Sequence, residues 1–483
     1  MTETEKNETS GQEEAPSEPV ISNTTYRQIV LALILAIPSI APGMTFGYSA
    51  VSLDSIPANL SQESWFASLA WIATPVGCLA SGPIMDNWGR RPALLLINIV
   101  GFCGWILLAY ASTTLSLYTG RILTGASIGF ASAPSSVYVA ECIASNSLQL
   151  RGILLTWPTV ALSTGILLVY IMGSLLRFTV VAGLGAIISV ASFFCILFFI
   201  PESPAWLLLK GRREDAEVAQ RRLGLGKPLS ESRVESGEAS TSTKLLPSQS
   251  ELTWSTAWEE LKKPEAYKPL TIVIFFFLFQ QFSGVLVVIN YLVEIVRISG
   301  FVLLNPYFVT VVAGFIILIC ACSVSFLLPK FGVKGLSTIS GVGIAISWLI
   351  IGLYIFIRRT WLVELQYSLF NLIPLCGIIL NVVSSSIGFY PLPFAILGEI
   401  FPPKIKGVAS GIATCVAYLF SFIAVKTFIY LQLHFYSAVI FFYAVMAAFG
   451  VIHVNLFLPE TTGKSLQEIV KHFSATKSGY EKI

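Results

Sequence analysis

Two short phrases decide the fold of this chain: Pro201-Glu202-Ser203-Pro204, and Pro459-Glu460-Thr461-Thr462-Gly463-Lys464-Ser465. Each phrase closes a run of six long hydrophobic stretches, and the two Pro-Glu pairs lie 258 residues apart (459 minus 201). Glu141 and Glu399 keep the same separation (399 minus 141). Because these marks repeat at one spacing, they predict two copies of a single six-helix unit.

The composition predicts that this unit lies in a membrane. Hydrophobic residues make up 55% of the 483 residues and charged residues 12%, whereas charged residues make up about 25% of ordinary soluble domains. The apolar stretches are about 20 residues long, enough to cross a bilayer. We therefore predict an all-α membrane protein with twelve transmembrane helices in two pseudo-symmetric six-helix halves. The expected spans are 27–50, 65–84, 93–111, 117–140, 153–173, 178–200, 269–296, 305–328, 335–357, 366–398, 407–430 and 436–458.

Polar segments flank and separate the two halves. The first 25 residues are polar and acidic, which predicts a disordered tail. The segment between the halves is rich in both charges and carries short helical patterns. The expected segments are a cytosolic tail 1–25, an N-terminal half 26–200, a cytosolic linker 201–268 with short helices, a C-terminal half 269–458 and a cytosolic tail 459–483.

The basic residues predict the orientation in the membrane. Short loops on the side of the termini carry more of them than the opposite short loops: Arg90, Arg91, Arg151, Lys330, Lys334, Lys404 and Lys406 against Arg177, Arg297, Arg358 and Arg359. Since basic loops stay in the cytosol, we expect both termini there, in a multi-pass protein of the plasma membrane. Asn59-Leu60-Ser61, in the first opposite loop, is a candidate glycosylation site and agrees with this orientation.

Acidic and basic residues recur at the ends of spans in both halves. A charge at membrane depth costs about 2.5–3.5 kcal/mol on insertion scales, so such residues need partners where helices pack. Parallel repeats of six helices are typical of transporters, which need two packings of nearly equal energy. Ion pairs that form when the cytosolic mouth closes would adjust that balance, although simple anchoring of helix ends is the alternative for any one residue. The predicted gating residues are Asp86, Arg90, Arg91, Arg121, Glu141, Arg151, Glu202, Lys334, Glu399, Lys406 and Glu460.

Several phrases occur in a recognisable order along the chain. They are Asp86-Asn87-Trp88-Gly89-Arg90-Arg91, Gly120-Arg121, Glu141 with Arg151-Gly152, the two Pro-Glu phrases, and Gln280-Gln281-Phe282-Ser283-Gly284. Together they resemble the signature set of the sugar porter family, which belongs to the major facilitator superfamily. The stretch from Gly398 to Phe428 is most similar to insect facilitated trehalose transporters. The resemblance implies the major facilitator fold and alternating access to a carbohydrate, with the two halves rocking about the site.

The resemblance also implies where a sugar would bind, since relatives use amide and indole side chains of spans 5, 7, 8, 10 and 11. Gln280 and Gln281 match this pattern. Thr159, Leu286 and Phe394 stand where relatives have Gln, Asn and Trp, so either other polar groups take over or the substrate is not an ordinary hexose. The predicted substrate-binding residues are Gln280, Gln281, Thr159, Asn290, Phe394 and Tyr418.

The first span predicts how transport is driven. Proton-coupled relatives carry an Asp after a Phe-Gly-Tyr phrase, whereas here Phe46-Gly47-Tyr48 is followed by Ser49, which cannot carry a proton at working pH. We therefore expect a uniporter that works by facilitated diffusion. Two alternatives stay open: a transporter of the same fold for another small polar solute, and a non-transporting sugar sensor.

The chain carries little that predicts catalysis. Its three histidines and eight scattered cysteines show no metal-ligand or disulfide pattern, and no nucleotide-binding loop is present. A net charge of +3 is too small to imply a nucleic-acid partner. We expect no enzyme activity, no cofactor and no metal, and a monomer whose partners are a small sugar and the lipid bilayer.

Overall fold

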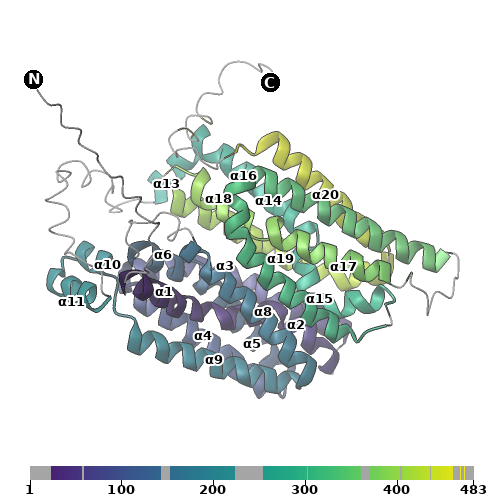
Figure 1. Cartoon of the computed structure of the whole chain (residues 1–483), viewed down its shortest axis with the longest axis horizontal. Helices are drawn as coiled ribbons and strands as arrows, with labels where there is room; N and C mark the ends of the chain where they lie inside the picture. The colour runs from purple at the N-terminus through teal and green to yellow at the C-terminus, as the bar shows by residue number, and fades with distance from the viewer. Residues whose placement is uncertain are drawn as a thin grey trace, which may run out of the picture.

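The computed structural model describes residues 23–56, 59–142, 153–223, 254–301, 303–360, 370, 372–402, 405–435, 437–460, 468 and 473. These residues are mostly helical, and no β-strand occurs among them. The helices form two bundles that lie side by side, the purple and blue first half against the green and yellow second half (Figure 1). The predicted fold of two six-helix halves is confirmed.

Six spans form the first half. The first consists of α1 (Asn23–Ala36), η1 (Ile37–Ser39), α2 (Ile40–Ser52) and η2 (Leu53–Ser55). The others are α3 (Leu60–Trp88), α4 (Arg90–Ala109), α5 (Thr114–Ala131) with α6 (Pro134–Cys142), α8 (Trp157–Leu175) and α9 (Phe178–Phe199). These elements account for all six predicted spans of this half.

The second half repeats the pattern. Its spans are α14 (Pro264–Phe282) with α15 (Val285–Ile298), α16 (Pro306–Thr360), α17 (Leu372–Ser384) with η5 (Ser385–Phe389) and α18 (Leu392–Ile400), α19 (Lys406–Phe435) and α20 (Ser437–Phe457). Eleven stretches of the described residues are long and apolar enough to cross a membrane. One of them is α16, which holds two spans because its backbone turns at Gly332 (φ 69°, ψ 168°). Spans 8 and 9 are therefore separated by a break at one residue and not by a longer loop. With α16 counted as two spans, the described residues contain twelve.

Two spans are interrupted near the middle of the second half. α14 and α15 join at Gly284, which adopts a left-handed conformation (φ 83°), and α15 is kinked again at Tyr291. Between α17 and α18 the chain forms the π-helical segment η5, followed by Pro391. Irregular backbone at membrane depth is tolerated where protein buries it, and π-helical turns often mark functional sites. Both interruptions lie close to the interface between the halves.

The two halves meet along three pairs of spans. α3 packs against α19, α2 against α15, and α8 against α16. Since each pair joins one helix from each half, groups on these faces can contact both halves at once. Short helices in the segment between the halves, α10 (Pro204–Leu209), α11 (Arg213–Leu223) and α13 (Trp254–Leu261), lie at one end of the bundles (Figure 1).

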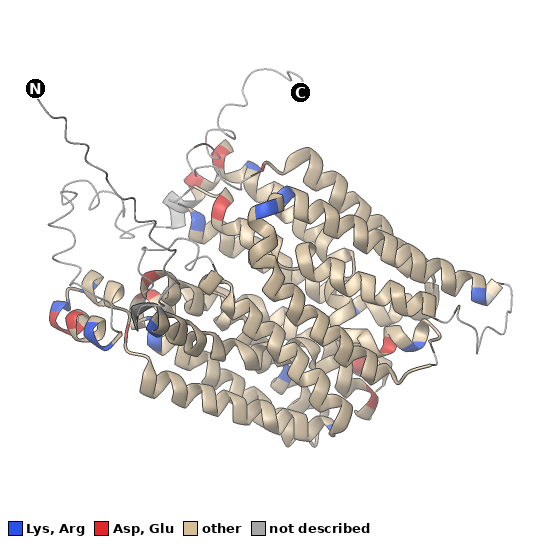
Figure 2. Ribbon diagram, viewed as in Figure 1, with Lys and Arg blue, Asp and Glu red and all other residues tan. Residues whose placement is uncertain are grey.

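Charged residues gather at the two ends of the bundles, and the length between them is almost free of charge (Figure 2). This distribution is what a bilayer requires. Residues 1–22 of the predicted tail 1–25, the linker residues 224–253 and most of the segment after Glu460 lie outside the described residues, as does the predicted gating residue Arg151. Residues 23–25 of that tail already belong to α1.

Candidate functional site

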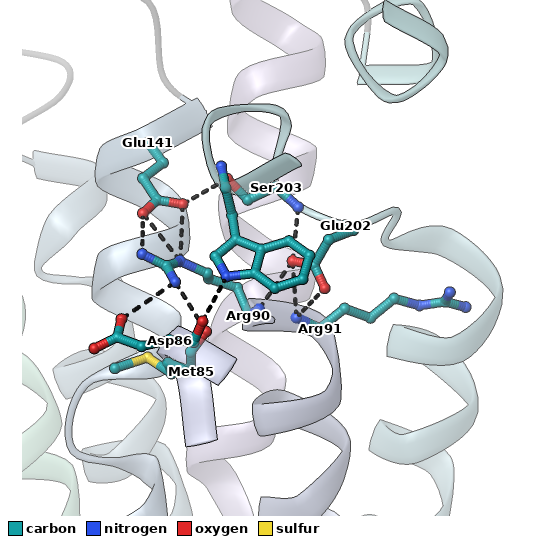
Figure 3. Close-up of polar contacts among 8 residues, drawn as sticks. Met85, Asp86, Arg90, Arg91, Glu141, Glu202 and Ser203 are labelled. Atoms are coloured by element: carbon teal, nitrogen blue, oxygen red, sulfur yellow. Dashed lines mark hydrogen bonds and ion pairs between the residues drawn. The ribbon is translucent and has the colours of Figure 1, made fainter. Parts of the chain in front are cut away.

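A cluster of ion pairs joins the helices of the first half at the end where α10 lies (Figure 3). Arg90 donates from Nη2 and Nε to Glu141 Oε1 at 2.8 and 3.0 Å. Its Nη1 reaches the Met85 carbonyl at 2.9 Å and lies 3.5 Å from Asp86 Oδ1. Ser203 Oγ donates to Glu141 Oε2 at 2.5 Å. The cluster therefore ties together α3, α4, α6 and the segment before α10.

The carboxylate of Glu202, a residue of the segment before α10, lies at the N-terminus of α4 and accepts hydrogen bonds from backbone amides. Its Oε1 accepts from the amides of Arg90 and Ser203 at 2.9 and 2.8 Å, and both oxygens lie 3.3 Å from the amide of Arg91. The first amides of a helix lack partners within it and carry partial positive charge, which favours a carboxylate there. Burial raises the pKa of Glu202, and the backbone hydrogen bonds oppose that rise.

A glycine makes room for this carboxylate. Gly89, between α3 and α4, has φ 109°, and a Cβ at this position would collide with Glu202. The second half repeats the arrangement: Glu460 accepts from the amides of Val333 and Lys334 at 3.1 and 3.3 Å. Gly332 before them has φ 69°, and a Cβ there would collide with Glu460. The two Pro-Glu phrases thus hold the same turn in both halves.

The structure brings together most of the gating residues predicted in the first half. The contacts of Asp86, Arg90, Arg91, Glu141 and Glu202 lie within that half. Arg91, whose Nη2 donates to the Leu197 carbonyl at 2.5 Å, contributes chiefly through backbone groups. In the second half Lys334 contributes its amide to Glu460, Glu399 is exposed in the last turn of α18, and Lys406 begins α19.

Arg121 does not belong to this cluster. Glu141 lies 20 residues further along the same span (141 minus 121), which at 1.5 Å per residue is about 30 Å. Arg121 is instead fully buried, and its Nη2 donates to Ser49 Oγ at 2.7 Å. Its Nε and Nη1 donate to the carbonyls of Phe66 and Thr45 at 3.0 and 3.1 Å. The prediction that Arg121 forms a gating ion pair at the cytosolic mouth is therefore wrong for this structure.

At the opposite end of the bundles, an ion pair crosses between the halves. Arg297 at the end of α15 makes a two-pronged pair with Asp54 of η2: Nη1 lies 2.6 Å from Oδ1, and Nη2 contacts Oδ2. The hydroxyl of Tyr307, in the first turn of α16, donates to Asp54 Oδ2 at 2.7 Å. Nearby, the Lys426 ammonium of α19 lies 3.9 Å from the ring centre of Trp65 in α3. The halves are thus joined at this end.

Aromatic rings from both halves meet at the centre of the interface. Trp71 of α3 stacks on Tyr418 of α19 (6.2 Å between ring centres, 15° between planes) and meets the ring of Phe46 edge-on at 4.8 Å. Phe46 lies 6.4 Å from Tyr390, and Phe394 lies 5.8 Å from Tyr418. We call these five residues the aromatic cluster. Neither Trp71 nor Phe46 was among the predicted site residues.

Amide side chains border the aromatic cluster. Gln280 Nε2 donates to the Tyr390 carbonyl at 3.3 Å, and Gln281 Nε2 donates to Gln280 Oε1 at 3.0 Å. Asn290 Oδ1 accepts a long hydrogen bond of 3.4 Å from Trp71 Nε1. Gln281 Oε1 is buried and has no hydrogen-bond partner among the described residues. Buried acceptors are usually satisfied, so this oxygen can accept a hydrogen bond from a hydroxyl group of a ligand.

A small cavity lies between the halves beside this region. Tyr170 of α8 lines it together with second-half residues, among them Val288, Ser385, Ser386 and Tyr390. Its volume is 10 Å³, about the least that holds one water molecule. A sugar therefore needs the halves to move apart. Its walls combine apolar side chains with hydroxyl groups.

Most of the predicted substrate-binding residues come together here. Gln280, Gln281, Asn290, Phe394 and Tyr418 form or border the aromatic cluster. Thr159 does not: it is exposed on α8, and within the described ranges no polar contact joins its hydroxyl to the cluster. The predicted glycosylation residue, Asn59, is exposed immediately before α3.

The arrangement suits transport of a neutral polar solute. It combines rings, amides and hydroxyls at an interface between two halves, and the described residues contain no group of His, Cys, Asp and Glu side chains that could hold a metal ion. The fold and this site define a membrane transporter of the major facilitator type.

Comparisons with known proteins support this class. The chain matches the family model "Sugar (and other) transporter" over residues 6–473. It is 30% identical over 454 residues to the facilitated trehalose transporter Tret1 of Bombyx mori, covering 92% of this chain and 86% of that protein. It is 31% identical to the sugar transporter ERD6-like 6 of Arabidopsis thaliana, covering 95% and 92%.

Solved structures show the same fold. The inward-open xylose transporter XylE of E. coli superimposes with a TM-score of 0.74 at 22% identity, covering 92% of this chain and 99% of that one. XylE bound to 6-bromo-6-deoxy-D-glucose gives 0.70 at 21% identity, covering 93% and 100%. The chain belongs to the sugar transporter family of the major facilitator superfamily. It is a membrane sugar transporter and not an enzyme.

Proposed function

We propose that this transporter carries a hexose or trehalose across the plasma membrane by facilitated diffusion, as a uniporter without proton coupling. The contact between Arg121 and Ser49 carries the proposal. A buried guanidinium is an effective partner for a carboxylate that takes up and releases a proton, but here it is satisfied by a hydroxyl and backbone carbonyls. A serine cannot exchange a proton at working pH, so no coupling group stands at this position.

Alternating access follows from where the contacts lie. The Asp54–Arg297 pair joins the halves at one end, whereas the Arg90–Glu141 cluster at the other end joins helices of one half. In this mechanism the first half moves as one body. The outer pair breaks when the path opens to the outside, and the aromatic cluster parts to admit the sugar.

The proposed sugar ligands are the five predicted residues at the centre of the interface. Gln280, Gln281 and Asn290 supply amides, and Phe394 and Tyr418 supply rings. Thr159 is proposed as a contact only when the halves move, because its side chain is exposed here. Trehalose is supported by the names of relatives such as Tret1 of Bombyx mori and of Apis mellifera ligustica.

The orientation is proposed from the basic loops, with both termini in the cytosol. Asn59 is exposed in the loop between the first two spans, which would then face outward. If it does, an endoglycosidase will remove a glycan from the protein, and Asn59→Gln will lack it. A glycan that persists in Asn59→Gln would count against this residue as the acceptor.

Radiolabelled uptake in transporter-deficient cells tests the function, with glucose, fructose and trehalose compared. We expect saturable uptake of at least one sugar, lost in Gln280→Ala and kept in Gln62→Ala, a glutamine in the first turn of α3. No uptake of any sugar, with the protein verified at the surface, would favour another small polar solute or a non-transporting sensor.

A further inference from the structure

Trp71 links the first half to the sugar ligands of the second. It is fully buried in α3, yet its ring stacks on Tyr418 and its Nε1 donates to Asn290 Oδ1, both across the interface between the halves. Phe46 packs edge-on against it from the same half. No other tryptophan of the described residues makes both a ring contact and an indole hydrogen bond across this interface.

A ligand can readily replace Asn290 as the acceptor of the hydrogen bond that Trp71 donates. At 3.4 Å it is longer than the usual 2.7–3.2 Å for an N–H donor, so little is lost when another acceptor replaces Asn290. Asn290 also keeps a hydrogen bond of its own, because its Nδ2 donates to the Leu286 carbonyl at 2.8 Å. A ligand hydroxyl that enters between Trp71 and Asn290 can accept from the indole and donate to the amide oxygen.

The stacked pair provides the complementary apolar contact. Rings of Trp71 and Tyr418 lie nearly parallel, one on each half, so separation of the halves exposes two flat apolar faces opposite each other. A pyranose chair presents C–H groups on its faces and hydroxyls around its rim. Phe394 in the same cluster offers a ring without a hydrogen-bonding group, whereas the indole N–H of Trp71 is the ring donor that the structure places on Asn290.

We propose that Trp71 is a sugar-contact residue that determines specificity: the indole face packs on the sugar ring, and Nε1–H donates to a sugar hydroxyl in place of Asn290. This inference rests on the proposed function as a sugar carrier. A site that bonds a particular hydroxyl discriminates against analogues that lack it. Removing the indole N–H therefore weakens both affinity and this discrimination.

The test compares Trp71→Phe and Trp71→Leu with Trp105→Phe. Trp105 is a matched control, because it is also fully buried in the first half but its Nε1 has no partner and it lies outside the aromatic cluster. Uptake kinetics are measured for the transported sugar and its monodeoxy analogues, and thermal unfolding in detergent checks that each variant is folded.

We expect Trp71→Phe to raise KM about 2- to 12-fold, the factor for one hydrogen bond, with Vmax nearly unchanged. The ratio between the KM of one deoxy analogue and the KM of the parent sugar should also become smaller in Trp71→Phe than in the wild type. Trp71→Leu should raise KM further, and Trp105→Phe should leave KM unchanged. If Trp71→Phe keeps the wild-type KM and analogue preference, the inference fails while the carrier function stands. If the wild type transports no sugar, both fail.

Discussion

Arg121 of α5 donates to the hydroxyl of Ser49 in α2 at 2.7 Å, in a fully buried position with no carboxylate among its hydrogen-bond partners. Four donor contacts, three of them to backbone carbonyls, satisfy the guanidinium. A buried cation needs such compensation. Arg121 therefore holds α2, α3 and α5 together.

Replacing Ser49 tests this reading. Ser49→Asp should make the initial uptake rate depend on pH, because the new carboxylate beside Arg121 can exchange a proton, whereas Ser49→Ala should keep the wild-type profile. Initial uptake rates are measured between pH 5.5 and 8 in the wild type, Ser49→Asp and Ser49→Ala. A wild-type profile in Ser49→Asp, at normal surface expression, would show that this position does not control coupling.

The Arg90–Glu141 pair should stabilise the first half. Its side chains are only 10% and 19% exposed, and removing one partner of a buried pair costs about 3 kcal/mol at the low end of measured values. Glu141→Gln should therefore lower the unfolding temperature in detergent. The control is Asp215→Asn, which breaks an exposed pair with Arg212 that contributes at most about 1 kcal/mol. Equal shifts in the two variants would contradict the prediction.

The turns at Gly89 and Gly332 should tolerate no side chain. Gly332→Ala would place a methyl group against Glu460 and hold alanine at positive φ, which costs about 1–3 kcal/mol. Gly411→Ala is the control, because its Cβ would meet no atom within 4 Å and it lies inside α19. Thermal unfolding should separate the two variants. A neutral Gly332→Ala would show that the Glu460 carboxylate can leave its position without cost.

In the proposed orientation, the Asp54–Arg297 pair should favour closure of the carrier at its outer end. Its side chains are 30% and 42% exposed, and such pairs contribute about 0.2–1 kcal/mol, so Asp54→Asn should shift the balance by at most about fivefold. We expect the labelling of a cysteine introduced in place of Ser68, which is fully buried in α3, to become faster with a reagent added from outside. The exchanged pair Asp54→Arg with Arg297→Asp should restore slow labelling. Unchanged labelling in Asp54→Asn would exclude this role.

The sequence was sufficient for the helices and for the repetition of the six-helix half. Apolar stretches of bilayer length and the two Pro-Glu phrases depend on local composition and spacing, and the structure shows Glu202 and Glu460 in matching turns. The rise along a helix could also have separated Arg121 from Glu141, because both lie on one span. Grouping them by charge alone led to the wrong partner.

Contacts across the interface between the halves could not be predicted from local sequence patterns. Trp71 and Asn290 are 219 residues apart, and Asp54 and Arg297 are 243 apart. Their meeting depends on how the two halves pack, which no local pattern encodes. One signal was available for the Asp54–Arg297 pair: the two residues end the first and seventh spans, which are equivalent in the two repeats, and they carry opposite charges.

Sugar uptake into proteoliposomes distinguishes facilitated diffusion from proton-coupled transport. Purified protein is reconstituted without an imposed ion gradient, and the transported sugar is followed to equilibrium with and without an inward proton gradient. We expect the sugar to reach equal concentrations on both sides, at a rate that neither the gradient nor a protonophore changes. Accumulation above the outside concentration that requires the proton gradient and collapses with a protonophore would contradict it.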